Sequence, residues 1–311
     1  MLDDTLVATL TAQFFNGLTI GGIYALIALG YTMVYGIIEL INFAHGELFM
    51  VGAFVSFSVL TGFGFAGPIT DPVTLTWVLA VAFVLTMLLL GVLGISIERF
   101  AYRPLRNAPR LAPLITAIGV SFILQNLISA IYGGSSKPTP QVFPFAWRFE
   151  ILGATIPWIT VFIFVVTVIL TVSLSQFIAR SRMGRAMRST AQDREAAQLM
   201  GVNINVTIAL TFFIGSALAG AAGIVYGLNY GTINFTMGFS AGLIAFTAAV
   251  LGGIGNITGA VLGGFIIGFI QVIAAQLGYS RWTDAVVFSV LIIVLVFRPS
   301  GLLGQQVGER A

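Results

Sequence analysis

A short stretch of polar residues, 39–47, holds the side chains of this chain that are best suited to proton transfer or to contact with a polar solute. It contains Glu39, Asn42, His45 and Glu47, and His45 is the only histidine among the 311 residues. One histidine and two carboxylates at these spacings, with no further candidate ligands nearby, do not predict a metal site. Acid–base catalysis is also unexpected, because the chain has no cysteine and no paired carboxylates within its apolar segments.

The stretch lies between two apolar segments, and the sequence leaves two interpretations of it open. Ionisable groups inside a membrane are costly and usually line a cavity or pair with one another. On that basis Asn42, His45 and Glu47 would belong to a broken helix that lines a solute path, as interrupted helices do in many transporters. In the other interpretation the stretch is a turn outside the membrane and its charges are in water.

A second interruption, Gly-Gly-Ile-Gly-Asn, divides the apolar region 238–277. A helix broken at this point would match the first interruption and would indicate an internal repeat, with each half contributing a break near the path. A tight glycine turn between two ordinary spans is the alternative. The candidate path residues here are Gly252, Gly253, Gly255 and Asn256.

The composition determines the elements that must hold these residues. Hydrophobic residues make up 58% of the chain and charged residues 8%, whereas a soluble domain is roughly 45–50% apolar and about 25% charged. The apolar segments reach the length of about 20 residues that a membrane-spanning helix needs, and the alternation typical of a membrane β-barrel is absent. The sequence therefore predicts one all-α polytopic membrane domain over 1–311. Its eight or nine transmembrane helices are expected at about 11–36, 46–62, 76–98, 111–131, 157–179, 206–228, within 238–277, and at 283–298.

The positive residues predict the orientation, because loops rich in Lys and Arg remain in the cytoplasm. Eleven of them fall on one side of the expected membrane and three on the other. The first group is Arg99, Arg103, Arg106, Arg110, Arg180, Arg182, Arg185, Arg188, Arg194, Arg298 and Arg310, and the second is Lys137, Arg148 and Arg281. This division places 180–205 in the cytoplasm and the loop 132–156 outside, with the N-terminus expected outside as well. Topology explains the net charge of +3, which therefore predicts no nucleic-acid partner.

The cytoplasmic loop carries its own signals for a short helix. Thr190 and Asp193 have the spacing of a capping box at a helix start, and Gly201 suits the position just after a helix end. A helix of about ten residues is too short to cross a membrane. Its small apolar face, formed by Ala196, Leu199 and Met200, is suited to docking into a groove of another protein.

Several segments together resemble the LivH-type permeases of branched-chain amino acid ABC importers, over about residues 10–304. The stretch 195–201, Glu-Ala-Ala followed by a glycine, is similar to the coupling segment of ABC importer membrane subunits, although the later proline of that pattern is missing. The other matching segments are 30–54, 96–106, 180–188 and 245–264.

The resemblance implies a multi-pass permease of the bacterial inner membrane that translocates leucine, isoleucine and valine. The expected partners are a second, LivM-type permease, two cytoplasmic ATP-binding subunits, a periplasmic solute-binding protein and the lipid bilayer. The resemblance also favours a broken helix at Gly252–Asn256. ATPase coupling is assigned by the resemblance to Glu195, Ala196, Ala197 and Gly201. The chain lacks a phosphate-binding loop of the Walker type, so we expect no ATPase site and no cofactor. We expect the external loop 132–156 to help receive the solute-binding protein.

Three other functions remain as alternatives. Permeases of urea or short-chain amide importers are similar in sequence to this family. An ion-coupled secondary transporter would need a carboxylate within the membrane, for which only Glu39 and Glu47 are candidates. A membrane-embedded enzyme is disfavoured by the scarcity of acid–base residues.

Overall fold

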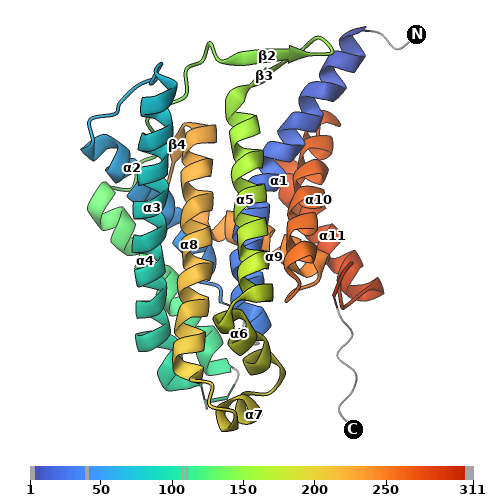
Figure 1. Cartoon of the computed structure of the whole chain (residues 1–311). Coiled ribbons are helices and arrows are strands. Elements are labelled where there is room, and N and C mark those ends of the chain that lie inside the picture. Colours follow the sequence, from blue (N-terminus) through green and yellow to red (C-terminus); the bar gives the residue numbers. More distant parts are fainter. Residues whose placement is uncertain (1–3, 39–41, 107, 110, 305–311) are drawn as a thin grey trace.

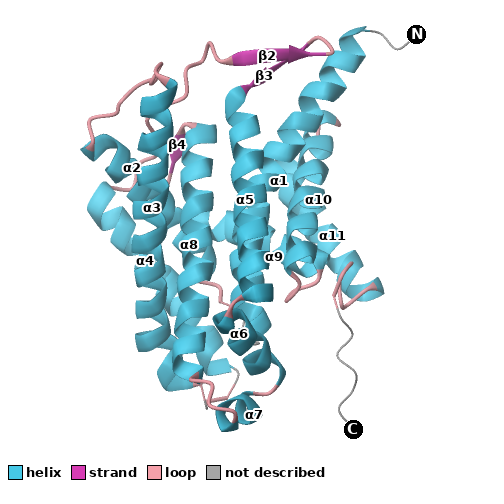
Figure 2. Ribbon diagram, in the orientation of Figure 1, coloured by secondary structure: helices cyan, strands magenta, loops and turns pink. Residues whose placement is uncertain are grey.

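The chain forms a bundle of long helices, shown in Figure 1 and coloured by secondary structure in Figure 2. The computed structural model describes residues 4–38, 42–106, 108–109 and 111–304. Eight helices in this described part are long and apolar enough to cross a membrane, which confirms the all-α polytopic fold. Seven of them are α1 (Asp4–Ile38), α2 (His45–Gly62), α3 (Pro72–Ile97), α4 (Leu111–Tyr132), α5 (Trp158–Arg180), α8 (Ile204–Tyr230) and α10 (Ile257–Gln276), and the eighth is α11 (Thr283–Phe297) with the 3-10 turn Ser280–Trp282 before it. Helix α9 (Met237–Gly252) is also apolar but shorter.

The two ends of the bundle differ in structure. At the end where the chain begins, the hairpin of β2 (Arg148–Ile151) and β3 (Ala154–Pro157) lies above α5 and reaches across to the first turns of α1 (Figure 1). At the same end β1 (Lys137–Pro138) pairs with β4 (Thr232–Ile233). The short helices α6 (Arg182–Gln192) and α7 (Arg194–Leu199) lie at the opposite end. We call the first the hairpin end and the second the α7 end.

Local sequence signals explain where several helices begin. Asp71 caps α3: its carboxylate accepts hydrogen bonds from the hydroxyl of Thr74 at 2.5 Å and from the backbone N–H of Thr74 at 2.8 Å. These bonds stabilise the ionised form and lower the pKa of Asp71. Pro72 follows in the first helical position, where its missing N–H costs nothing. After α3 the chain continues into a π-helical turn at Glu98–Tyr102 and a 3-10 turn at Arg103–Leu105.

Glycines allow the central helices to approach one another closely. A Cβ atom added at Gly52 of α2 would lie 2.7 Å from the Cα of Gly220 in α8, and one added at Gly223 would lie 2.5 Å from the backbone nitrogen of Ala53. Similar contacts join α10 to α1, where a Cβ at Gly264 would lie 2.5 Å from the Cα of Ala25. In lipid no hydrophobic effect drives helices together, and small residues at helix crossings allow their backbones to pack closely.

This packing gives a stability prediction. Gly223→Val would force α2 and α8 apart and should destabilise the protein by about 1–3 kcal/mol through overpacking. Gly119→Val is the matched control, because Gly119 in α4 has no neighbouring atom within 4 Å of an added Cβ. Thermal unfolding of the purified variants in detergent measures the difference. Equal melting temperatures for the two variants would show that the close crossing of α2 and α8 does not exist.

Candidate functional site

The polar stretch found in the sequence is buried in the bundle. Asn42 is 2% exposed, and His45 and Glu47 are fully buried. The interpretation of this stretch as a turn in water is therefore wrong for these three residues. Glu39 lies outside the described residues.

Glu47 lies at mid-depth in the bundle. One of its carboxylate oxygens accepts hydrogen bonds from the hydroxyl of Ser121, at 3.1 Å, and from the side-chain amide of Gln125, at 2.6 Å. Ser121 is near the middle of α4 and so lies about 15 Å from either end of that helix. The other carboxylate oxygen of Glu47 is buried, and no described residue is a hydrogen-bond partner for it. Helix α2 thus begins inside the bundle rather than at its surface.

Asn42 organises the chain just before α2. Its side-chain oxygen accepts hydrogen bonds from the backbone N–H of Ala44, at 3.0 Å, and from the hydroxyl of Tyr102, at 2.7 Å. The ring of His45 then packs edge-on against Tyr31 of α1, with 4.6 Å between the ring centroids. The bond to Ala44 satisfies part of the exposed backbone that an interrupted helix leaves within a membrane.

The first residues of α9 lie against the first residues of α2. A Cβ atom at Gly46 would meet the carbonyl oxygen of Gly238 and would lie 2.8 Å from the Cα of Gly242. A Cβ at Gly238 would lie 2.8 Å from the carbonyl oxygen of Gly46. The N-terminal ends of two helices therefore meet inside the bundle, with backbone in direct contact. We call this contact the α2–α9 junction.

The two sides of the junction are a repeat in sequence and in structure. Residues 41–46 read Ile-Asn-Phe-Ala-His-Gly and residues 233–238 read Ile-Asn-Phe-Thr-Met-Gly. The side-chain oxygen of Asn234 accepts the backbone N–H of Thr236 at 3.1 Å, just as Asn42 accepts that of Ala44. The repeated Ile-Asn-Phe-x-x-Gly was the signal in the sequence that could have located the second interruption.

The two helices leave the junction in opposite directions. Helix α2 leads to the hairpin end, where the backbone of Ile69 bonds to that of Val142 at 2.9 Å. Helix α9 leads to the α7 end, where Gly255 lies against Gly36 near the end of α1. In Figure 1 the label of α2 lies nearer the hairpin end than that of α9. Inverted repeats that contribute interrupted helices at mid-depth are a recurring feature of secondary transporter folds.

The second interruption predicted from the sequence is in the wrong place. Gly252, Gly253, Gly255 and Asn256 form a tight turn between α9 and α10, with positive φ at Gly253 (+107°) and Gly255 (+93°). Asn256 caps α10 and also donates to the carbonyl of Leu303 at 2.8 Å. The hypothesis of a broken helix at these residues is therefore wrong, because only glycine reaches such φ values easily and the chain uses them here to reverse direction.

The predicted helix start in the α7 region needs a correction. Thr190 is not a cap: it lies inside α6, where its hydroxyl donates to the carbonyl of Ala186 at 2.8 Å. Asp193 is the cap, and its carboxylate accepts the backbone N–H of Ala196 at 3.0 Å. One continuous helix was expected, but the chain forms two short ones because Asp193 is extended, with a φ of −156°.

The predicted helix end is confirmed. Gly201 has a φ of +84°, and its N–H donates to the carbonyl of Gln198 while that of Val202 donates to the carbonyl of Ala197, both at 3.0 Å. This is a Schellman motif, in which glycine takes the left-handed conformation. The tip of α7 exposes Leu199 (88%) and Met200 (85%), and Ala197 is buried against the rest of the chain.

Further contacts connect α7 to the rest of the α7 end. The guanidinium of Arg194 donates to the carbonyl of Ile38, the last residue of α1, at 2.6 Å. Arg106 forms an ion pair with Glu98 and donates to the side chain of Asn205 at 2.7 Å. A cleft of about 720 Å³ lies between these parts. Its lining residues are Arg103, Arg106, Arg194, Glu195, Gln198, Gly201, Val202, Asn203, Ile204, Asn205 and Ile208.

A bundle of apolar spans that buries ionisable groups where two interrupted helices meet belongs to the class of polytopic membrane transport proteins. Comparison with known families is more specific. The sequence model of one family, described as the permease component of the branched-chain amino acid transport system, matches residues 13–296. The chain belongs to this family, and we infer from it a transport subunit rather than an enzyme.

Individual relatives match over nearly the whole chain. It is 46% identical over 301 residues to the high-affinity branched-chain amino acid transport system permease protein BraD of Pseudomonas aeruginosa, covering 96% of this chain and 97% of that protein. It is 45% identical over 302 residues to the LivH permease of Escherichia coli K12, covering 96% of each. A probable LivH permease of Methanocaldococcus jannaschii is 28% identical over 64% of this chain and 60% of its own length. No solved structure matches the chain.

The geometry around Glu47 gives a testable prediction. Glu47→Ala would leave Ser121 and Gln125 without their acceptor and should cost about 1–3 kcal/mol, the usual penalty for an unsatisfied buried polar group. Glu47→Gln keeps an acceptor oxygen and should cost less, whereas Glu195→Ala, at an exposed glutamate, should leave stability unchanged. Thermal unfolding in detergent provides the comparison. Identical stability of all three variants would mean that Glu47 does not hold α4 to α2.

Proposed function

We propose that this chain is the permease subunit of an ATP-driven ABC importer of the bacterial inner membrane, and that its substrates are the branched-chain amino acids. The observation that carries the proposal is the α2–α9 junction, because it provides an interrupted backbone and buried polar groups at mid-depth in a protein of the permease family. Hydrolysis of ATP would take place in partner subunits.

The solute path in this proposal passes the α2–α9 junction. Asn42 and Glu47 contribute polar atoms for which the described residues provide no hydrogen-bond partner: the amide nitrogen of Asn42 and one oxygen of Glu47. His45 adds a fully buried imidazole. Unpaired polar groups in a buried place are costly, and a zwitterionic solute could pair with them when the junction opens. The turn at Gly252–Asn256 is left out of the path, because Asn256 is already engaged in capping α10 and in its bond to Leu303.

The substrate class rests on the relatives. The bacterial relatives described above are named as high-affinity branched-chain amino acid transport permeases, and each is aligned over almost its full length. None of the relatives compared is named for urea or amides. We therefore favour leucine, isoleucine and valine over those solutes.

Uptake by the reconstituted importer tests this proposal. Vesicles that contain the full complex, with ATP enclosed and the solute-binding protein outside, should accumulate labelled leucine only when ATP is present. Valine and isoleucine should compete and urea should not. Accumulation driven by a proton or sodium gradient without ATP would instead identify a secondary transporter, and competition by urea or short amides alone would identify the related importers.

The α7 region is the proposed contact with the ATP-binding subunits. Glu195 and Ala196 are exposed beside the apolar tip of Leu199 and Met200, so the helix offers both a charge and apolar surface to a groove. Ala197 has a different part in this proposal: because its side chain is buried, it positions the helix rather than touching the partner. Gly201 sets the direction in which the chain returns to α8.

A route from this contact to the α2–α9 junction runs through Arg194. Its bond to the carbonyl of Ile38 joins α7 to the end of α1, and only six residues separate Ile38 from His45, the first residue of α2. Movement of α7 against a partner would thus pull directly on the chain that enters the junction.

The remaining proposed partners are a second, LivM-type permease and a periplasmic solute-binding protein.

The outer loop is the proposed receiving surface for the solute-binding protein. The β2–β3 hairpin lies across this end of the bundle (Figure 1), and its turn exposes Leu152 (69%) next to Gly153. Replacing 149–156 by two glycines should lower leucine uptake in the vesicle assay but leave the ATP-binding subunits bound. Unchanged uptake would mean that the loop only connects α4 to α5 and does not receive the solute-binding protein.

Gly201→Val tests the coupling helix against a matched control. A β-branched residue at a φ of +84° should strain the backbone by about 1–2 kcal/mol and tilt α7. Gly278→Val imposes the same strain at a φ of +85° at the hairpin end, and neither glycine has a neighbour within 4 Å of an added Cβ. Only Gly201→Val should lose solute-stimulated ATP hydrolysis. Equal loss in both variants would indicate general damage rather than failed coupling.

Arg194→Gln tests the route to the junction. We expect the ATP-binding subunits still to bind, because the exposed residues of α7 are kept, but hydrolysis and uptake to become uncoupled as the bond to Ile38 weakens. Arg182→Gln is the control, since Arg182 is exposed at the start of the neighbouring helix α6. The ratio of leucine taken up to ATP hydrolysed is the quantity to measure. The same ratio in both variants would refute a role for Arg194.

A further inference from the structure

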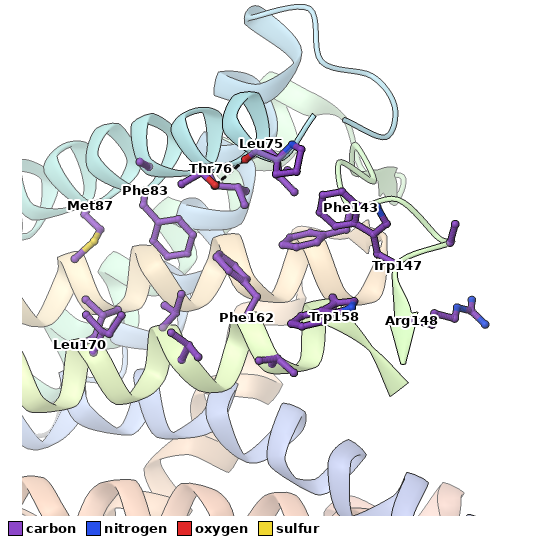
Figure 3. Close-up of a pocket in the computed structure, with 18 residues that line it drawn as sticks. Leu75, Thr76, Phe83, Met87, Phe143, Trp147, Arg148, Trp158, Phe162 and Leu170 are labelled. Atoms are coloured by element: carbon purple, nitrogen blue, oxygen red, sulfur yellow. Dashed lines mark hydrogen bonds between the residues drawn. The ribbon is translucent and has the colours of Figure 1, made fainter. Parts of the chain in front are cut away.

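A long apolar groove lies between α3 and α5 (Figure 3). Its volume is about 990 Å³. Its floor is aromatic: the ring centroid of Phe162 lies 6.0 Å from that of Phe83 and 5.2 Å from that of Phe143. Nothing in the proposed transport path uses this groove, which is distinct from the α2–α9 junction.

The groove has the depth of one leaflet of a membrane. Along α5 its lining residues run from Trp158 to Leu170, which at the rise of a helix is about 18 Å. Half of the hydrocarbon core of a bilayer is about 15 Å. The groove therefore extends from the hairpin end of the bundle to about the middle of the membrane.

The mouth of the groove carries the residue types of a membrane interface. Trp147 and Trp158 line it there, and tryptophan is enriched where lipid headgroups begin. Figure 3 shows Arg148 extending past Trp158 at this end. Its Nε donates to the carbonyl of Phe145 at 3.0 Å. Among the described residues, the recorded ion pair joins Arg106 and Glu98, so the guanidinium of Arg148 remains available to an outside anion.

We propose that this groove binds a glycerophospholipid of the leaflet at the hairpin end. One acyl chain lies along Phe83 and Phe162, and the phosphate sits at Arg148. Guanidinium binds phosphate through charge-assisted hydrogen bonds, and the apolar walls suit a hydrocarbon chain of this length. The lipid fills the space between α3 and α5 and supports Trp147 and Arg148 at the start of β2.

The shape of the groove favours a lipid over a helix from another subunit. A helix with its side chains is about 10–12 Å across. The walls of the groove converge until Phe83 from α3 and Phe162 from α5 touch at its floor. A cleft that narrows in this way accepts a flexible chain more readily than a rigid cylinder.

Lipid retention by the full-length chain tests the proposal. The protein is purified from its membrane with a detergent wash that removes loosely held lipid, and native mass spectrometry counts the phospholipids that remain. Two variants address the site: Arg148→Gln removes the phosphate contact, and Val165→Trp places a large ring in the groove. The matched controls are Arg281→Gln, at another cation of the hairpin end, and Val168→Trp, at a lipid-facing residue of α5 that does not line the groove.

The wild-type chain and both controls should retain one phospholipid. Arg148→Gln should retain it about tenfold more weakly, as expected for the loss of one charge-assisted contact, and Val165→Trp should lose it while its melting temperature is maintained. Equal retention in all variants, or none in the wild type, would overturn the proposal. So would a photo-crosslinker at Ala80 that captures another protein of the complex rather than lipid.

Discussion

The structure depends on one constraint: a helix interrupted inside a membrane must still find partners for its backbone N–H groups. The first N–H groups of a helix have no partner within the helix. Here the backbone carbonyl of an asparagine accepts the first N–H group of each helix, Asn42 that of His45 at 3.0 Å and Asn234 that of Met237 at 3.4 Å. The side-chain oxygen of the same asparagine accepts the N–H just before the helix, that of Ala44 or Thr236. Glycine supplies the other requirement, since Gly46 and Gly238 let the two helix ends come into contact. Without the two Ile-Asn-Phe-x-x-Gly motifs, α2 and α9 could not begin inside the bundle, and Asn42, His45 and Glu47 would not be buried there.

The remaining helices support the junction from both sides. Helix α10 crosses α1 through Gly264 and Ala25, and α2 crosses α8 through Gly52 and Gly220, so the interrupted helices are held between close-packed, continuous ones. Helix α4 is attached differently. It is exposed along much of its length, and its polar contact with Glu47 lies at mid-depth. The bundle thus combines a tightly packed centre, where a path would have to open, with looser helices around it.

Much of the fold follows from composition and periodicity, but the position of the break does not. Apolar length alone predicted the spans, and the arginine distribution separated the α7 end from the hairpin end. The helix end at Gly201 could be predicted because a glycine that directly follows a helix commonly closes it in the left-handed conformation. The break at α9 was missed because Ile233–Gly238 contains no charge to mark it, whereas Gly252–Asn256 attracted attention through its glycines and proved to be a turn. Burial of Glu47 could not be predicted either, since it depends on Ser121 and Gln125, more than 70 residues away.

The central claim is that α2 begins in a sealed junction rather than in a loop in water. The chain has no cysteine, so a single one can be introduced at Ala44, which is fully buried and small enough to be replaced conservatively. A membrane-impermeant maleimide applied from each side of the membrane should leave Ala44→Cys unlabelled until the protein is denatured. Leu199→Cys, at a residue that is 88% exposed, should be labelled at once from the α7 side. Labelling of both cysteines at the same rate would contradict the account.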